Sequence, residues 1–380
     1  MTGPRVLILT ASYGSGHNRV AEALARELRR AGASVLVVDH FRTLVHPRFD
    51  EATQALYALV LRRAPGLWRL AYWWGDQLRG DSPLLLGANR LGAARLARLL
   101  DATAPDHVIS VHPTPAASLS FLGRRGRAIP SHTAVLTDFV AHGQWLSSHV
   151  DRYCAPAPEI ADGLSRRGVP AARIAVTGIP VDAEFAYPRD RVAARRELGF
   201  SPGDPCVLLM AGAGGVLGRL EEATRVVAAL SPPWQAVAVG GRDEPLRRRL
   251  QAIARGREER IRVVGYVDNV WQLMAAADVI VTKAGAVTLA EALAAELPVV
   301  TFGSLAGHEV RNERFVAGAG AALRAPDGIA LADALASLVA DSRKLRAMRD
   351  RVRALRQPQA ARAVAALVLG ARCLTREAVS

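Results

Sequence analysis

Short apolar runs alternate along the chain with longer amphipathic runs. In the first half, the short apolar runs predict buried parallel strands: 5–10, 34–39, 106–113, 133–136 and 151–155. The segment 174–182 ends this half. A polar loop, 11–18, and a helical pattern at about 19–30 connect the first two strands, which makes a βαβ unit. We therefore predict the α/β class, with a doubly wound parallel sheet whose ligands bind at the carboxyl ends of the strands.

The same pattern restarts after residue 205, which predicts a second domain of the same kind. Its strands are predicted at 206–210, 235–239, 260–265, 279–281 and 298–302. The segment 186–205 carries three prolines and a charged amphipathic piece, which is typical of a linker. We predict an N-terminal domain, 1–185, and a C-terminal domain, 206–380. The last helix of the chain, beyond the break at Pro358, is free to pack back on the first domain.

The stretch 279–293 combines a strand, a turn at Gly285 and a helix with Thr288 in its first turn. The first amides of such a helix point outward, so the stretch, with Lys283 at its turn, predicts a site for an anion. Glu291 lies one turn into the helix, too far to act only as a cap, and its carboxylate can bind sugar hydroxyls. An ordinary βα unit capped by threonine would show the same local pattern.

The second domain also carries a glycine loop directly after its first strand. Gly212, Gly214 and Gly215 let backbone amides approach a diphosphate closely, next to the helix that starts at Leu220. The loop lacks the Lys-Ser/Thr ending of a P-loop, which argues against ATP hydrolysis. After the strand 260–265, the backbone of Tyr266 and Val267 is placed to meet a nucleotide base.

Polar side chains follow the strands of the first domain. His17 begins the first helix, where a histidine can serve as general base or simply cap and pack. Asp138 and His142 follow the strand 133–136, and they either orient an acceptor or bond to their own loop backbone. The carboxyl ends of parallel strands share one edge of a sheet, so these residues are expected near one another.

Between Tyr57 and Arg98, tryptophan and tyrosine alternate with arginine. Trp68, Trp73 and Trp74 lie among these basic residues, a composition that suits the interface of an anionic membrane. A helical pair that packs its aromatic side chains into the domain would give the same composition, so both interpretations stay open.

Composition narrows the class of partner. The formal net charge is +14, but lysine occurs only at Lys283 and Lys344, and the arginine-rich, alanine-rich bias is typical of a GC-rich coding sequence. No zinc-finger, helix-turn-helix or RNP-like motif supports nucleic-acid binding, so we expect no nucleic-acid partner. The cysteines, Cys154, Cys206 and Cys373, are isolated and lack metal-ligand spacing, so we expect free thiols in a reducing compartment.

Targeting signals are not evident either. No apolar run reaches the roughly 18 residues that a membrane-spanning helix needs. The apolar run at 6–9 is too short for the core of a secretory signal peptide. We expect a cytoplasmic protein.

Five motifs in this order resemble one known family: 12–17 (SYGSGH), 137–139 with His142 and Trp145, the glycine loop 212–218, 283–291 (KAGAVTLAE) and 307–312 (GHEVRN). The set is similar to the monogalactosyldiacylglycerol synthases of plants and the diacylglycerol glucosyltransferases of bacteria, in glycosyltransferase family 28. The resemblance covers roughly Val6 to Leu323. It implies the GT-B fold, two Rossmann-like domains facing a central cleft.

The resemblance also implies roles for residues. His17 matches the proposed base, Glu291 the carboxylate on the ribose, and the glycine loop the seat of the diphosphate. His308 and Glu309 match the pair that reads the donor sugar, with Asn312 nearby. This sequence has Ala286-Val287 where the family usually has Pro-Gly, and His308 where it usually has Gln, so the identity of the sugar is left open.

The reaction implied is inverting transfer of a hexose from a UDP-sugar to a lipid hydroxyl such as that of diacylglycerol. His17 takes the proton, with Asp138 assisting, and no metal is required. The protein would bind the anionic inner face of the cell membrane peripherally. The alternatives are transfer to a soluble aglycone or a lipid-linked peptidoglycan intermediate, epimerisation of a UDP-sugar, and binding without turnover.

Overall fold

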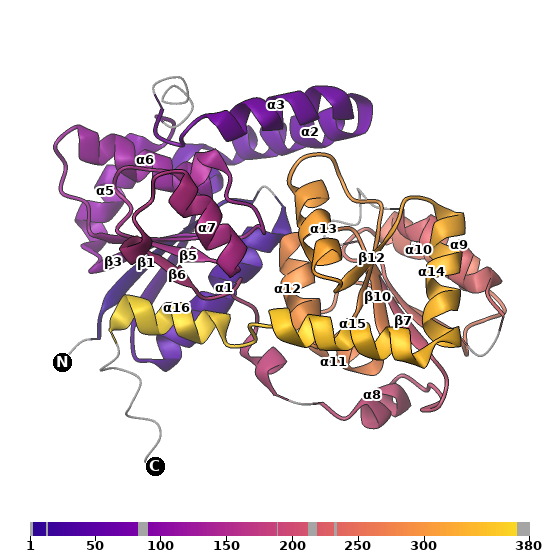
Figure 1. Cartoon of the computed structure of the whole chain (residues 1–380). Helices are drawn as coiled ribbons and strands as arrows, with labels where there is room; N and C mark the ends of the chain where they lie inside the picture. Colours follow the sequence, from indigo (N-terminus) through magenta and orange to yellow (C-terminus); the bar gives the residue numbers. More distant parts are fainter. Residues whose placement is uncertain are drawn as a thin grey trace, which may run out of the picture. The chain divides into compact units, whose positions relative to one another are not determined.

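Two six-stranded sheets, each parallel throughout, form the framework of the chain (Figure 1). This computed structural model describes residues 3–12, 14–82, 90–187, 189–211, 219–231 and 234–370. The chain divides into two compact units: unit 1 comprises Met1–Ala183 and Gln359–Ser380, and unit 2 comprises Glu184–Pro358. Each sheet carries helices on both faces, which confirms the predicted α/β class and doubly wound plan.

In unit 1 the strands lie in the order β2-β1-β3-β4-β5-β6. The strands are β1 (Arg5–Thr10), β2 (Ser34–Asp39), β3 (His107–Ser110), β4 (Ser131–Val135), β5 (Arg152–Ala155) and β6 (Ile174–Val176). The α-helices are α1 (Ser15–Arg30), α2 (Pro47–Arg63), α3 (Pro65–Gln77), α5 (Ala93–Thr103), α6 (Pro113–Arg124), α7 (Pro158–Arg166) and α16 (Ala360–Leu369). Short π- or 3₁₀-helical turns are η1 (His40–Val45), η2 (Gly143–Trp145) and η3 (Ala171–Arg173).

The core of unit 1 forms around β1, which is buried from Val6 to Thr10. Alternate side chains of a strand point to opposite faces. Leu7 and Leu9 therefore share one face, where they pack in one cluster with leucines of α5 and α6. The helices α1 and α16 pack against each other, and Figure 1 shows α16 on the side of the sheet opposite α5 and α6. The last helix of the chain thus belongs to unit 1.

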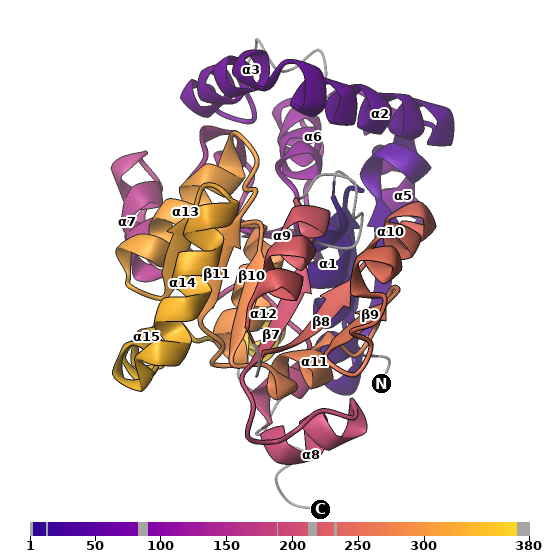
Figure 2. The same cartoon turned by 90° about the vertical axis from the view of Figure 1, so that its right-hand side faces the viewer.

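In unit 2 the order is β12-β11-β10-β7-β8-β9. The strands are β7 (Cys206–Met210), β8 (Gln235–Val239), β9 (Ile261–Val264), β10 (Val279–Thr282), β11 (Val299–Phe302) and β12 (Ala322–Ala325). The helices are α8 (Arg191–Glu197), α9 (Leu220–Ala229), α10 (Glu244–Ala254), α11 (Val270–Ala276), α12 (Ala286–Ala294), α13 (His308–Gly318), α14 (Gly328–Ala340) and α15 (Ser342–Leu355), with the short 3₁₀ turn η4 (Ala183–Ala186) at the entry to the unit. Figures 1 and 2 show α9, α10 and α14 on one face of this sheet and α12 on the other.

The segment 186–205, predicted as a linker, belongs to unit 2 in the structure. Its helix α8 packs against α11. Asp278, just before β10, accepts hydrogen bonds from Arg191 and Arg195, and also from Arg349 of α15. The Arg195 side chain is only 5% exposed, and a buried guanidinium is stable only when its charge is paired. These ion pairs fix α8 to unit 2, so the chain leaves unit 1 near Ala183.

The two cysteines that the structure describes, Cys154 and Cys206, are free and buried, as predicted from their spacing. Burial raises the pKa of each thiol to about 12, so neither is a thiolate at neutral pH. Cys373 lies outside the described residues.

Candidate functional site

His17 lies where the sheet of unit 1 reverses its strand order. The chain passes from β1 to β2 in one direction and then returns to β3 on the other side of β1. Ligands of open α/β sheets bind outside the carboxyl ends of the strands at such a switch point. His17 is in the first turn of α1, directly after β1. Gly14, the residue that caps α1, has φ of 88°, a conformation that residues with a Cβ rarely adopt.

Two contacts fix the ring of His17. Its Nδ1 is 2.8 Å from the carbonyl oxygen of Val111, which follows β3, and 3.0 Å from Oγ1 of Thr137, which follows β4. A carbonyl oxygen only accepts hydrogen bonds, so Nδ1 carries the ring hydrogen and donates. The basic nitrogen of the neutral ring is then Nε2. A tautomer held in this way is compatible with a general base, and that role remains a prediction for this residue.

A chain of short hydrogen bonds shapes the loop beneath His17. Thr10 donates to Asn18 (2.8 Å), the amide of Asn18 donates to Ser12 (3.0 Å), and Ser12 donates to Asp39 (2.5 Å). Asp39 also accepts from the backbone of Arg42. These hydrogen bonds connect the ends of β1 and β2 with the first turn of α1. They thereby hold that turn, which carries His17, in place.

His112 is a neighbour that the sequence analysis did not single out. Its ring lies edge-on to His17, with centroids 4.8 Å apart. Its Nδ1 accepts from the backbone of Thr114 and so caps α6. Burial, and then the neighbouring His17 and His40, hold the pKa of His112 well below the usual value for histidine. The signal in the sequence was its place at the tip of β3, the strand that pairs with β1.

Of the two predicted residues after β4, His142 has a clear structural role. Its Nδ1 accepts a hydrogen bond from the backbone of Gln144 and caps η2. Its ring packs against that of Tyr72 of α3, with ring centroids 4.5 Å apart. This is the loop-stabilising alternative that the sequence analysis left open. Asp138 is partly exposed directly after Thr137, and its assisting role remains a prediction.

The predicted donor motif occupies the equivalent switch point of unit 2. Here the strand order reverses between β7 and β10, and the stretch with Lys283 and Gly285 connects β10 to α12. Gly285 is the residue that caps α12, and no side-chain cap bond forms there in the described part of the chain. Thr288 lies in the first turn of α12 but is not its cap. Gly212, Gly214 and Gly215 of the loop after β7 lie outside the described residues.

Lys283 and Glu309 form an ion pair across this site. The Glu309 side chain is 3% exposed; one of its oxygens binds Nζ of Lys283 and the other accepts from the backbone of Leu305 at 2.8 Å. Asn312 is buried and donates to the carbonyl oxygen of Ala284 at 3.2 Å. The structure thus brings four predicted residues together: Lys283, Gly285, Glu309 and Asn312.

The remaining predicted donor residues lie at the same edge of the sheet. Glu291 lies in the second turn of α12 and is 5% exposed. His308 begins α13 beside Gly307, whose φ of 98° favours glycine. Tyr266 and Val267 follow β9, and the guanidinium of Arg242 stacks on the Tyr266 ring at 3.9 Å from its centroid.

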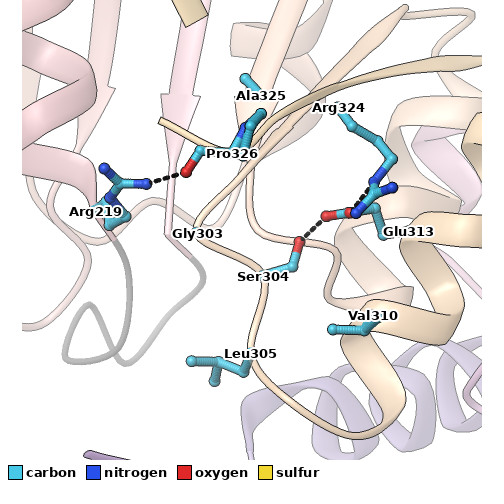
Figure 3. A pocket seen from close by; sticks show the side chains of 9 residues that line it. All are labelled: Arg219, Gly303, Ser304, Leu305, Val310, Glu313, Arg324, Ala325 and Pro326. Carbon is cyan, nitrogen blue, oxygen red and sulfur yellow. Dashed lines mark hydrogen bonds and ion pairs between the residues drawn. The ribbon is translucent and has the colours of Figure 1, made fainter. Parts of the chain in front are cut away.

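A pocket of about 760 Å³ opens beyond β11 and β12. Figure 3 shows the side chains that line it: Arg219, Gly303, Ser304, Leu305, Val310, Glu313, Arg324, Ala325 and Pro326. None of them was predicted as a site residue. The available signal was Arg324, a charged residue within the otherwise apolar run of β12.

The aromatic, basic segment forms a helical pair, α2 and α3, which we call the hairpin. Some of its aromatic side chains pack within the pair, and contact with a membrane remains a prediction. Tyr57 of α2 packs on Trp68 of α3 with ring centroids 4.9 Å apart. Trp73 and Trp74 instead are 52% and 57% exposed, and leucines of the hairpin are exposed with them: Leu56, Leu59, Leu67 and Leu70. Every helix in the part of the chain that the structure describes is too short or too polar to cross a bilayer.

Comparison with known proteins then identifies the family. Residues 17–181 match the model of monogalactosyldiacylglycerol (MGDG) synthase, and residues 196–355 match that of glycosyl transferases group 1. A processive diacylglycerol β-glucosyltransferase of Bacillus licheniformis is 30% identical over 354 residues, which cover 93% of this chain and 91% of the relative. The chain belongs to the family of the diacylglycerol glucosyltransferases. The protein of the same name from Bacillus thuringiensis is 31% identical over 358 residues, 94% of this chain and 91% of the relative.

Solved structures of other members of the fold agree with this placement. MurG of Acinetobacter baumannii has a TM-score of 0.63 at 18% identity, and the match covers 96% of this chain and 99% of MurG. MnaA of S. aureus, solved with UDP, has a TM-score of 0.60 at 14% identity, covering 95% and 94%. At such identities the likeness concerns the fold alone, which is GT-B, as the resemblance implied.

Proposed function

We propose that the protein transfers a hexose from a UDP-sugar to diacylglycerol or a closely related membrane lipid. The match to diacylglycerol glucosyltransferases over 93% of this chain carries the proposal, because it spans both units rather than one nucleotide-binding half. The two switch points supply chemistry that fits: a fixed histidine in unit 1, and in unit 2 a helix N-terminus beside a buried carboxylate.

In the proposed reaction, the acceptor hydroxyl gives its proton to Nε2 of His17. Its oxygen attacks C1 of the hexose from the side opposite UDP. The bond from C1 to the diphosphate breaks, and UDP leaves with the electron pair, so the anomeric configuration inverts. Nδ1 keeps its hydrogen bond to the carbonyl oxygen of Val111, which stabilises the imidazolium ring formed by this transfer.

We further propose that the departing diphosphate is stabilised by backbone amides rather than by a metal ion. The first turn of α12 presents its amides toward the switch point of unit 2, and the helix dipole adds favourable charge there. The glycines of the loop after β7 would add more amides. Lys283 is held next to this turn by Glu309, so its charge lies near the same position.

The hairpin is the part that we propose meets the anionic inner face of the cell membrane. Its exposed tryptophans and leucines suit the depth of the lipid headgroups, and arginines of the same segment suit anionic lipids. A peripheral protein docked in this way would take its acceptor directly from the bilayer.

The proposal is tested by incubating the protein with single UDP-sugars, in EDTA, with vesicles that contain diacylglycerol. We expect a lipid product heavier by one hexose, formed equally well with EDTA and with added Mg²⁺ or Mn²⁺. Product only with a soluble aglycone or a peptidoglycan intermediate would replace the acceptor. Conversion of the UDP-sugar without any acceptor would indicate an epimerase, and a need for divalent ions would overturn the amide-only account.

Glu291 offers a separate test of the donor site. Loss of a charged hydrogen-bond acceptor on a ribose hydroxyl typically costs about 1.5–3 kcal/mol. Glu291→Ala should therefore raise the KM for the UDP-sugar by about ten-fold or more, with a smaller change in kcat. Steady-state kinetics at saturating lipid would measure this. Glu291→Gln keeps the shape of the side chain, so its KM for the UDP-sugar should lie between those of the unmodified protein and Glu291→Ala. An unchanged KM in both variants would reject the ribose contact.

A further inference from the structure

The loop between β4 and β5, residues 136–151, carries Thr137 to the ring of His17. The contact joins Oγ1 of Thr137 and Nδ1 of His17 at 3.0 Å. The structure describes the whole of this β4–β5 loop, and its only regular part is the short turn η2. Thr137 and most of the residues from there to η2 are buried. Because a buried loop lacks the hydrogen bonds of a sheet, its position depends on the groups that satisfy its backbone.

Asp76, near the end of α3, supplies one such group. Its side chain is buried, and Oδ1 accepts a hydrogen bond from the backbone of Gly143 in η2 at 2.9 Å. Arg167, the residue that caps the end of α7, donates to the same Oδ1 and to the backbone carbonyl oxygen of Asp76, both at 2.9 Å. Hydrogen bonds to a carboxylate are stronger than those to a neutral acceptor. Asp76 thus connects α3, α7 and the β4–β5 loop at one point.

The backbones at this junction approach so closely that two positions require glycine. A Cβ on Gly143 would lie 2.3 Å from the carbonyl oxygen of Asp76, and a Cβ on Gly80 would lie 2.1 Å from a carbonyl oxygen of η2. Both distances are far shorter than van der Waals contact. His142 adds a hydrogen bond from Nε2 to the carbonyl oxygen of Tyr72 in α3 at 3.4 Å. These contacts seat the β4–β5 loop against α3.

We propose that Asp76 is a positioning residue for the general base: it holds η2 so that Thr137 stays against Nδ1 of His17. The inference rests on the proposed function, in which Nε2 of that ring takes the proton of the acceptor. Asp76 acts through the loop and not on the reacting atoms. A displacement of about 1 Å in a catalytic group can cost about 100-fold in rate, so loosening the anchor of a loop that touches this ring has a measurable effect on turnover.

Asp81 provides a matched control at the other end of the same loop. It is also buried, accepts a hydrogen bond from the backbone of Ser148 at 2.7 Å, and pairs with Arg124 at 2.9 Å. Its amide partner lies beyond η2, toward β5. Asp81→Ala should therefore lower the melting temperature as Asp76→Ala does, because both leave an arginine without its carboxylate, yet it should leave the contact between Thr137 and the ring in place.

The test is a double-mutant cycle between Asp76→Ala and Thr137→Val, with kcat measured at saturating UDP-sugar and saturating diacylglycerol vesicles. Asp76→Ala alone should lower kcat about ten-fold. The KM for the UDP-sugar should stay within about two-fold, because the donor motif lies in the other unit. In the Thr137→Val background, Asp76→Ala should cost less than about two-fold, since its effect passes through the missing hydroxyl. Asp81→Ala should leave kcat near the unmodified value.

Two milder variants keep the cycle informative if Asp76→Ala melts below the assay temperature. Asp76→Asn retains an oxygen that accepts from the backbone of Gly143, so it should restore most of kcat. Arg167→Gln removes the ion pair but leaves the carboxylate, so it should show the same non-additive loss with Thr137→Val in smaller measure.

A second measurement needs no turnover. In protein with labelled histidine, the NMR signal of the His17 ring should shift in Asp76→Ala toward its position in Thr137→Val and stay unchanged in Asp81→Ala. Independent losses of kcat in the cycle, an unshifted ring signal, or an equal loss of kcat in Asp81→Ala would overturn the positioning role and leave the proposed function standing. The expected ring shifts in a protein that turns over no UDP-sugar would instead reject the proposed function and keep the positioning role.

Discussion

Replacing His17 with alanine should lower kcat by a factor on the order of 100 or more, because general-base catalysis typically contributes 10²–10⁴. The neighbouring histidine, His112, is not expected to substitute for this residue. Nδ1 is committed to Val111, so the basic Nε2 has one fixed orientation, and His112 beside it has a strongly lowered pKa and serves as a helix cap. The measurement is kcat at saturating UDP-sugar and saturating lipid vesicles.

Two further variants make this result specific. His107→Ala removes a histidine from the amino end of β3, at the edge of the sheet opposite His17, and should leave kcat near the unmodified value. Thr137→Val removes the second contact of Nδ1 but keeps the bond to Val111, so we expect an intermediate loss. Near-normal kcat in His17→Ala, with the Kd of UDP unchanged, would show that another group takes the proton.

The strands were predictable from the sequence because burial in a parallel sheet leaves a local signature. The run 5–10 coincides with β1, and the prediction for 206–210 coincides with β7. Where a strand ends on polar residues, the pattern was less exact. The run 106–113 was predicted as one strand, but β3 ends at Ser110 because His112 caps α6 and Pro113 begins it. In sequence alone, a polar residue that caps a helix cannot be told from one that ends a strand; the two are distinguished only once the start of the following helix is known.

The contacts that make the site were beyond local pattern. Thr137 reaches the His17 ring across 120 positions of sequence, and Glu309 pairs with Lys283 across 26. Such pairs follow from which strand lies next to which, and that order is set by the packing of the whole sheet. The candidate residues could therefore be named from strand ends and from the family motifs, whereas their partners required the fold.

The pocket beyond β11 and β12 shows a second limit. Glu313 reads in the sequence as an ordinary charged residue of a helix, and only Arg324 stands out, as a charge within the apolar run of β12. Their ion pair forms because α13 packs on β12, which brings two charged groups to the rim of an otherwise apolar edge. The local patterns do not show that these two residues form an ion pair, just as they do not show the surface pair Arg353–Glu296.

The second large effect is expected at the hairpin. Trp73→Ser together with Trp74→Ser should lower partition onto anionic vesicles by at least an order of magnitude. Each exposed indole offers on the order of 100 Å² to the interface, and at about 25 cal/mol per Å² this gives an upper bound of about 2.5 kcal/mol per ring. Sedimentation with vesicles of increasing anionic-lipid content would measure the loss, and turnover of vesicle-bound diacylglycerol should fall with it.

The control removes equally exposed apolar groups elsewhere. Ile329 and Val339 of α14 are 77% and 42% exposed and lie outside the hairpin, so Ile329→Ser with Val339→Ser should leave sedimentation unchanged. A short-chain, water-soluble diacylglycerol separates docking from catalysis, since its turnover should be nearly normal in the tryptophan variant. Equal sedimentation of the tryptophan variant and the unmodified protein would mean that the two indoles do not hold the protein at the membrane, and binding through arginine charge would be tested next. In that case raised salt should release both proteins alike, because exposed charges are screened within about 10 Å at 0.1 M salt, whereas a bound indole resists it.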